Sequence, residues 1–104
     1  MEIENITFDE YKAMTADGNG PVVLDFYADW CGPCRMLAPV FDEVAEEHPT
    51  AYRYARVNVD EQPELTSSFG ISVIPTLVVM NAGNEVALST GYLDKEGLLA
   101  FLNL

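Results

Sequence analysis

The chain has 104 residues, 49% of them hydrophobic, and its 17 acidic and 5 basic residues give a formal net charge of −12 at pH 7. This length suffices for a single hydrophobic core, so we expect residues 1–104 to form one domain. So acidic a surface repels phosphate backbones and anionic lipids, which argues against nucleic-acid or membrane-surface binding. The charge either serves solubility or favours partners with basic surfaces, and the sequence leaves both open.

Hydrophobic periodicity predicts nine elements of secondary structure. In chain order they are an edge strand over residues 2–6, a helix over 8–16, a strand over 22–27, a helix over 35–47, a strand over 51–59, a short helix over 63–69, strands over 76–80 and 85–90, and a helix from 95 onward. Residues 81–84, Asn-Ala-Gly-Asn, are a hairpin signal between the last two strands. The order β-α-β-α-β-α-β-β-α predicts an α/β fold, with a central mixed sheet of about five strands flanked by about four helices.

Capping residues mark the helix ends. Thr7 and Glu10 have the spacing of a capping box, and residues 17–20 end the first helix. Gly70 is expected as the C-cap of the short helix, and Asp94 as the N-cap of the last one.

The helix over residues 35–47 has two faces. Its inward stripe consists of apolar residues at helical spacing, Met36, Leu37, Val40, Phe41, Val44 and Ala45. The opposite face carries four acids that we expect to be solvated, Asp42, Glu43, Glu46 and Glu47. His48, the only histidine, ends the helix and is not expected to be catalytic.

The only two cysteines, Cys31 and Cys34, follow the strand over 22–27 and begin the next helix. A Cys-x-x-Cys pair in this position is typical of dithiol–disulfide chemistry, and two cysteines with one histidine are too few for a structural zinc site. Cys31 lies at the helix N-terminus, where free N–H groups and the helix dipole stabilise a thiolate. We therefore predict that Cys31 attacks a disulfide and that Cys34 resolves the resulting mixed disulfide.

Gly32 and Pro33 separate the two cysteines. Gly32 removes bulk where a substrate chain approaches, and Pro33 fixes the first helical turn. Neither residue titrates, which favours a reductant rather than an oxidant. Residues 1–5 lack the features of a signal peptide and no apolar run is long enough to span a bilayer, so we expect a cytoplasmic protein.

Asp25 stands in the middle of an otherwise apolar strand. A buried carboxylate is costly unless it is paired or protonated, and burial raises its pKa towards neutrality. One interpretation is a structural ion pair with Arg56, on the strand predicted beside it. The other is that Asp25 accepts the proton of Cys34 when Cys34 attacks, and both can hold together.

Pro75 is expected at the start of a strand, because proline is excluded from the interior of a central strand. The residues alone predict a trans Ile74–Pro75 bond, the common form of an X–Pro bond. Gly91 alone indicates no more than a bend.

Together these residues resemble the thioredoxin family over nearly the whole chain. The positions that carry the resemblance are Asp25, Trp30-Cys31-Gly32-Pro33-Cys34, Pro39, Asn58-Val59-Asp60, Ile74-Pro75-Thr76, Gly83 and Gly91. The resemblance implies a cis Pro75 packed beside the cysteines. It also implies a shallow apolar groove that binds substrate polypeptide, formed by Trp30, Gly32, Pro33, Ile74, Pro75 and Gly91.

The resemblance further implies a redox carrier with no cofactor beyond the Cys31–Cys34 disulfide and no metal. Its substrates would be proteins with disulfides, held by backbone pairing with the residue before Pro75. Its electron donor would be a thioredoxin reductase using NADPH or ferredoxin. We expect a monomer.

Three positions depart from the family pattern. Tyr27 stands where a second tryptophan is common, Arg56 where lysine is common, and Tyr92 where a small residue is common. Arginine keeps its proton at ordinary pH, so Arg56 is a fixed counter-ion that would hold the pKa of Asp25 lower than lysine would.

The leading hypothesis is a general protein-disulfide reductase. The alternatives are a disulfide oxidase or isomerase, against which the Gly-Pro pair argues, and a binding subunit with the same fold, which would need neither cysteine.

Overall fold

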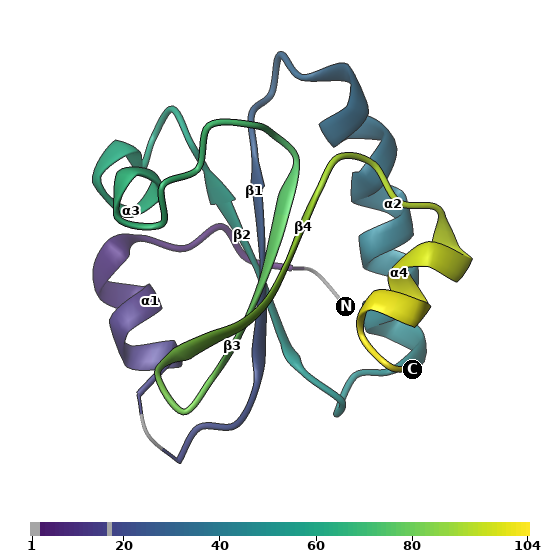
Figure 1. Cartoon of the computed structure of the whole chain (residues 1–104), viewed down its shortest axis with the longest axis horizontal. Coiled ribbons are helices and arrows are strands. Elements are labelled where there is room, and N and C mark those ends of the chain that lie inside the picture. The colour runs from purple at the N-terminus through teal and green to yellow at the C-terminus, as the bar shows by residue number, and fades with distance from the viewer. Residues whose placement is uncertain (1–2, 17) are drawn as a thin grey trace.

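The computed structural model of the protein describes residues 3–16 and 18–104, so Glu2 and Asp17, which belong to two of the predictions above, lie outside the described residues. The described chain forms four helices and four strands (Figure 1). In chain order these are α1 (Phe8–Met14), β1 (Val22–Tyr27), α2 (Gly32–Glu47), β2 (Arg53–Asn58), α3 (Pro63–Ser68), β3 (Thr76–Asn81), β4 (Asn84–Thr90) and α4 (Lys95–Phe101).

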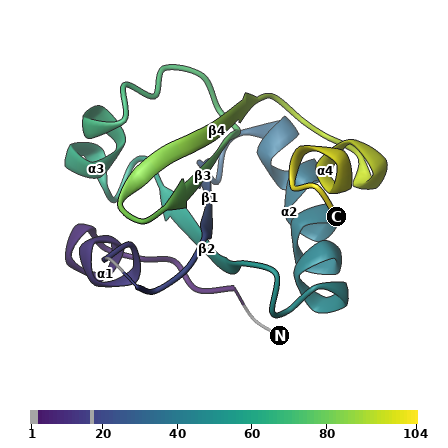
Figure 2. The same cartoon turned by 60° about the horizontal axis from the view of Figure 1, so that its bottom comes forward.

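The strands form one mixed sheet in the order β2-β1-β3-β4. β1 is parallel to β2, with α2 as the crossover between them, and antiparallel to β3, which forms a hairpin with β4. Figures 1 and 2 show α1 and α3 on one face of the sheet and α2 and α4 on the other. The predicted class, an α/β fold with a central mixed sheet flanked by helices, is confirmed.

The sheet has four strands in the described chain, not the five that the sequence predicts. Residues 4–6 make only an isolated parallel bridge, in which the N–H of Ile6 donates to the carbonyl of Arg56 and the N–H of Arg56 donates to the carbonyl of Glu4. The chain then turns at Thr7 into the cap of α1. The stretch is therefore too short to extend along β2.

Two hydrophobic cores lie on the two faces of the sheet. Alternation along β1 sends Val22, Leu24 and Phe26 to the core under α1 and α3, and Val23 to the core under α2 and α4. All four side chains are fully buried, which confirms β1 as a central strand. Asp25 shares the face of Val23 by the same alternation, so it points towards α2.

Thr7 and Asp94 cap the helices at which the sequence predicts them, and Gly70 does not. The side-chain oxygen of Thr7 accepts the N–H of Glu10 and the Glu10 carboxylate accepts the N–H of Thr7, which completes the capping box. Asp94 caps α4. The C-cap of α3 is Phe69 rather than Gly70, which follows with a φ of 65°.

One prediction about the faces of α2 is wrong. Met36 is 58% exposed, because it lies about 100° around the helix from Leu37, which is on the buried stripe. The prediction of a solvated acidic face agrees with the structure, in which the side chains of Asp42, Glu43 and Glu47 are 43%, 51% and 45% exposed. These acids also form ion pairs, Asp42 with Arg56, and Glu43 and Glu47 with Lys95 at the start of α4. The outer face of α2 therefore consists partly of ion pairs that connect it to the sheet and to α4.

Candidate active site

Cys31 and Cys34 form a disulfide where β1 gives way to α2. Cys31 is the N-cap of α2, and the Cα atoms of the two cysteines are 5.2 Å apart. The Sγ of Cys31 accepts the backbone N–H of Cys34 at 3.2 Å. One sulfur thus lies among the free N–H groups at the positive end of the α2 dipole, as the sequence predicts.

Both cysteines are buried, with 6% and 3% of their surface exposed for Cys31 and Cys34. They form a small cluster with Ala28, against which Tyr27 and Ile74 pack. The Sγ of Cys31 lies 3.9 Å from the carbonyl oxygen of Ile74. The two cysteines are therefore almost equally buried, and they differ in their neighbours: Cys31 lies near the carbonyl of Ile74, and Cys34 lines a cavity that Asp25 also lines.

Exposed residues surround the disulfide on its outer side. The Trp30 side chain is 69% exposed, and its Nε1–H donates to Oδ2 of Asp60 at 2.8 Å. Pro33 is also exposed. A Cβ built on Gly32 would meet no atom of the described residues within 4 Å, so packing does not require a glycine there. The side of Gly32 is open for an approaching chain.

Pro75 and Gly91 lie side by side at the ends of β3 and β4. The Ile74–Pro75 bond is cis, as the family resemblance implies and contrary to the expectation from the residues alone. The N–H of Gly91 donates to the carbonyl of Pro75 at 2.7 Å, and Gly91 has a φ of 91°, which favours glycine. Because Cys31 approaches the carbonyl of Ile74, the structure brings the predicted groove residues together around the disulfide.

Asp25 is 1% exposed and faces Arg56, its register partner on β2. The Nε of Arg56 is 3.7 Å from Oδ2 of Asp25, an ion pair longer than a hydrogen bond. Neither carboxylate oxygen has a hydrogen-bond partner among the described residues. Burial raises the pKa of Asp25 from 3.8 to about 7, while the Arg56 charge lowers it and the Asp42 charge raises it further.

Asp25, Cys34 and Arg56 border one cavity of about 420 Å³ that opens to the surface. Tyr27 and Arg35 also line it. A water needs about 30 Å³ and two or more polar partners, so this cavity has room for waters between Asp25 and the sulfur of Cys34. The structure thus connects the buried carboxylate with the cysteine to which the sequence assigns it.

Comparison with known proteins decides the family. A family model described as "Thioredoxin" matches residues 2–104. The chain belongs to the thioredoxin family. It is 53% identical over 85 residues to a thioredoxin of Alicyclobacillus acidocaldarius, covering 82% of this chain and 81% of the other. It is 39% identical over 103 residues to a thioredoxin of Pyropia yezoensis, covering 99% and 96%.

A solved structure agrees with this assignment. The crystal structure of the Malassezia sympodialis thioredoxin superposes with a TM-score of 0.89 at 32% identity, covering 98% of this chain and 89% of the other. With a Cys-x-x-Cys pair at disulfide distance, this thioredoxin-family chain is a thiol–disulfide oxidoreductase. Its redox-active group is the disulfide itself, and family members carry no cofactor.

The described part of the chain holds no group of three or more histidine, cysteine, aspartate and glutamate side chains arranged for a metal ion. Within the same residues, no helix is long and apolar enough to cross a membrane.

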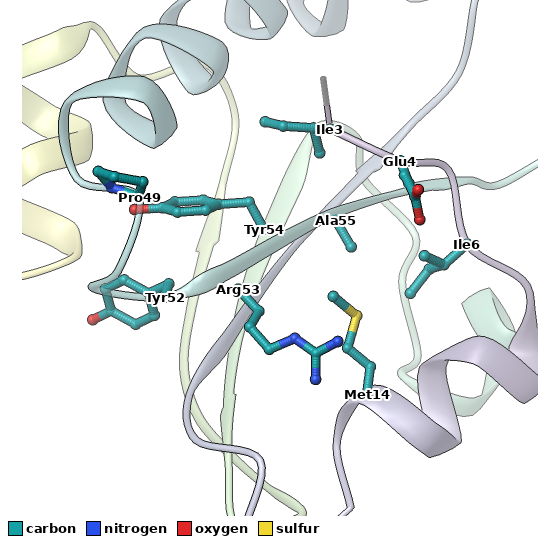
Figure 3. Close-up of a pocket in the computed structure, with 9 residues that line it drawn as sticks. All are labelled: Ile3, Glu4, Ile6, Met14, Pro49, Tyr52, Arg53, Tyr54 and Ala55. Carbon is teal, nitrogen blue, oxygen red and sulfur yellow. The ribbon is translucent and has the colours of Figure 1, made fainter. Parts of the chain in front are cut away.

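A second cavity, of about 280 Å³, lies at the other end of β2 (Figure 3). Side chains of the N-terminal segment, the end of α1 and the start of β2 line it, among them Ile3, Met14, Arg53 and Tyr54. As far as the described residues go, its lining includes neither cysteine nor Asp25. This cavity is therefore separate from the redox site.

Sequence reasoning missed the role of two acids around the thioredoxin site. It placed Asp42 on a solvated face, which agrees with its 43% exposed side chain, but gave it no partner, whereas Asp42 binds Arg56 at 3.0 Å. It gave Asp60 no contact with the site, whereas Asp60 accepts a hydrogen bond from the Trp30 indole. A possible signal for Asp42 was its place next to the buried Phe41, at the border of the apolar stripe.

Proposed function

We propose that this chain is a general protein-disulfide reductase in which Cys31 attacks and Cys34 resolves. The observation that carries the proposal is the position of the disulfide: Cys31 is the N-cap of α2, and Cys34 borders the cavity that Asp25 also lines. The non-titrating Gly32 and Pro33 between them support the reducing direction.

The first half of the reaction uses the thiolate of Cys31. The reduced Cys31 sulfur attacks one sulfur of a substrate disulfide, forms a mixed disulfide, and displaces the other substrate sulfur as a thiolate that takes a proton from solvent. The N–H of Cys34 and the N-terminus of α2 stabilise the Cys31 anion before the attack.

The second half requires a nucleophile at Cys34. The thiol of Cys34 passes its proton to the carboxylate of Asp25 through water in the shared cavity, and its sulfur then attacks Cys31. The Cys31–substrate bond breaks, the substrate leaves as a dithiol after protonation, and the Cys31–Cys34 disulfide forms. Arg56 is a fixed counter-ion that stabilises the ionised state of Asp25.

Substrate polypeptide is proposed to bind over the residues around the disulfide, Trp30, Gly32, Pro33, Ile74, Pro75 and Gly91. The exposed indole of Trp30 and the open side of Gly32 support this surface. The carbonyl of Ile74, near the Sγ of Cys31, is placed to pair with a substrate backbone.

The partners proposed are disulfide-containing proteins and a thioredoxin reductase that regenerates the dithiol and so makes the chain an electron carrier. We place the protein in the cytoplasm, because a dithiol reductant works in a reducing compartment. We also propose that it is a monomer. The net charge of −12 supports a role without nucleic acid or membrane surfaces.

The test is reduction of insulin disulfides with dithiothreitol or a thioredoxin reductase and NADPH as electron source. We expect turnover by the wild type and none by Cys31→Ser. Equal rates for the two proteins would refute the catalytic role. Equilibrium titration of the cysteine pair against glutathione tests the direction, and a potential as high as that of strong oxidants would contradict a reductase.

A further inference from the structure

Arg56 is held by three groups of α2. Its Nη2 donates to the carbonyl of Ala38 and to Oδ1 of Asp42, each at 3.0 Å. Its guanidinium carbon lies 5.6 Å from the centre of the Phe41 ring, within the range of a cation–π contact. By contrast, its Nε only faces Asp25 at 3.7 Å. The guanidinium is thus bound to α2 and stands back from Asp25.

The two carboxylates compete for one guanidinium. Arginine presents five N–H donors in a planar fork that suits bidentate binding of a carboxylate. Charge-assisted hydrogen bonds of this kind form at about 2.7–2.9 Å, so Arg56 would need to move less than about 1 Å to bind Asp25 directly. The bonds to Asp42 and to the carbonyl of Ala38 oppose that movement.

We propose that Asp42 is a positioning residue for the second half of the reaction, because it holds the Arg56 guanidinium on α2 and so leaves the carboxylate oxygens of Asp25 free to take the proton of Cys34. The inference rests on the proposed role of Asp25. No bond is made or broken at Asp42: the proton leaves the Sγ of Cys34 for Asp25, and the electron pair left on sulfur attacks Cys31.

Without Asp42, Arg56 is expected to turn onto Asp25. A direct hydrogen bond from the guanidinium adds to the charge effect that Arg56 already exerts at 3.7 Å, so the pKa of Asp25 is expected to fall by about 1, the low end of the range for a carboxylate beside arginine. The other titratable or charged side chains that line the cavity come from β1, the loop after it and α2, and they stay in place: Tyr27, Asp29, Cys34 and Arg35. Loss of the Asp42 charge also lowers the pKa of Asp25 directly, because that charge raises it, so the part of the shift that depends on Arg56 is read from the comparison with an Arg56→Met background.

The experiment follows the carboxyl carbon of Asp25 by NMR as a function of pH, in the oxidised protein. We expect the Asp25 transition to fall by about 1 pH unit or more in Asp42→Asn and to stay in place in Glu43→Gln. Glu43 is a matched control, because it lies on the same helix, loses the same charge, and binds Lys95, which keeps Glu47.

A kinetic readout separates positioning from a merely structural role. Reduced protein mixed with the aromatic disulfide of Ellman's reagent releases one coloured thiol on attack by Cys31 and a second when Cys34 resolves. The rate of the second release, plotted against pH, falls on the acid side as Asp25 becomes protonated. In Asp42→Asn this fall should move to lower pH by the same amount as the Asp25 transition seen by NMR. An unchanged pH profile of the second release in Asp42→Asn would overturn the proposal.

Three further outcomes would overturn it: an unchanged or raised Asp25 pKa in Asp42→Asn, an equal shift in Glu43→Gln, or a shift of full size when Asp42→Asn is made in an Arg56→Met background. The last would show that Asp42 does not act through Arg56. Failure of the wild type to reduce insulin would instead refute the proposed function and would leave the titration result standing.

Discussion

Replacing Asp25 by asparagine removes a buried carboxylate while keeping nearly the same shape. The wild-type carboxyl has a pKa of about 7 in the folded protein against 3.8 when exposed. Between these two pH values the unfolded chain has released the proton and the native protein still holds it. Wild-type stability therefore falls as pH rises through this window and levels off above about pH 7.

The magnitude follows from the width of the window. At 1.36 kcal/mol for each pH unit, the full interval between 3.8 and 7 is worth about 4 kcal/mol. Near its pI of about 4.1 the protein carries little net charge and tends to associate, so the measurement is made from pH 5 to pH 8. About 3 kcal/mol of the change in wild-type stability falls within this range. Asp25→Asn has no such loss, so its advantage over the wild type should grow by about 3 kcal/mol across this range.

The assay is urea unfolding of the oxidised wild type and Asp25→Asn at each pH. The quantity compared is how the difference in free energy of unfolding between the two proteins changes with pH. Any pH-independent cost of burying the amide of Asp25→Asn cancels from this change. Asp29→Asn serves as control, because it removes an exposed carboxylate at the same cavity. A difference that stays constant from pH 5 to pH 8 would refute the reasoning. The same variant should also resolve mixed disulfides more slowly near neutral pH, since it lacks the proton acceptor.

Three predictions concern the rest of the site and the fold. Cys34→Ser should leave a mixed disulfide between Cys31 and a substrate peptide, visible by intact mass spectrometry, and Cys31→Ser should leave none; the reverse would exchange the two roles. Trp30→Ala should raise KM for a protein disulfide and leave the reduction potential unchanged, because the exposed indole supplies contact area; a changed potential would contradict this. Thr7→Ala should lower the free energy of unfolding in urea by about 1 kcal/mol without changing turnover, because it removes the capping box of α1; equal stability would count against that cap.

Features fixed by short-range patterns were predictable from the sequence. The apolar run of β1 indicated a strand covered on both faces, and the Thr7–Glu10 spacing indicated a cap. The hairpin turn also followed from its residues, since Gly83 suits the positive φ that a two-residue turn requires, although the other turn residue, Ala82, adopts a positive φ that alanine disfavours. The position of the cysteines at the N-terminus of a helix belongs to the same class.

Features that depend on where side chains meet in space were not predictable. The sequence indicated that Asp25 and Arg56 lie on neighbouring strands, but not that the guanidinium is bound to α2 at 3.0 Å and stands 3.7 Å from Asp25. Helical spacing alone places Asp42 among solvated acids, because the pattern does not show how closely β2 approaches that edge of α2. The cis Pro75 followed only from the family resemblance, since local preference favours trans.

The pairing of β1 with β3 has a consequence for how the protein acquires its activity. The cysteines follow β1, whereas Ile74 and Pro75 precede β3, and Phe26 pairs with Thr76 far later in the chain. Contacts between residues so far apart in the chain are intrinsically slow to form, because the entropy of closing the loop opposes them. We therefore expect a nascent chain to carry its two thiols before the proposed substrate surface around Ile74 and Pro75 has formed. Reduction of a protein disulfide, which needs that surface, should therefore appear only once β3 has paired with β1, later than the formation of α2.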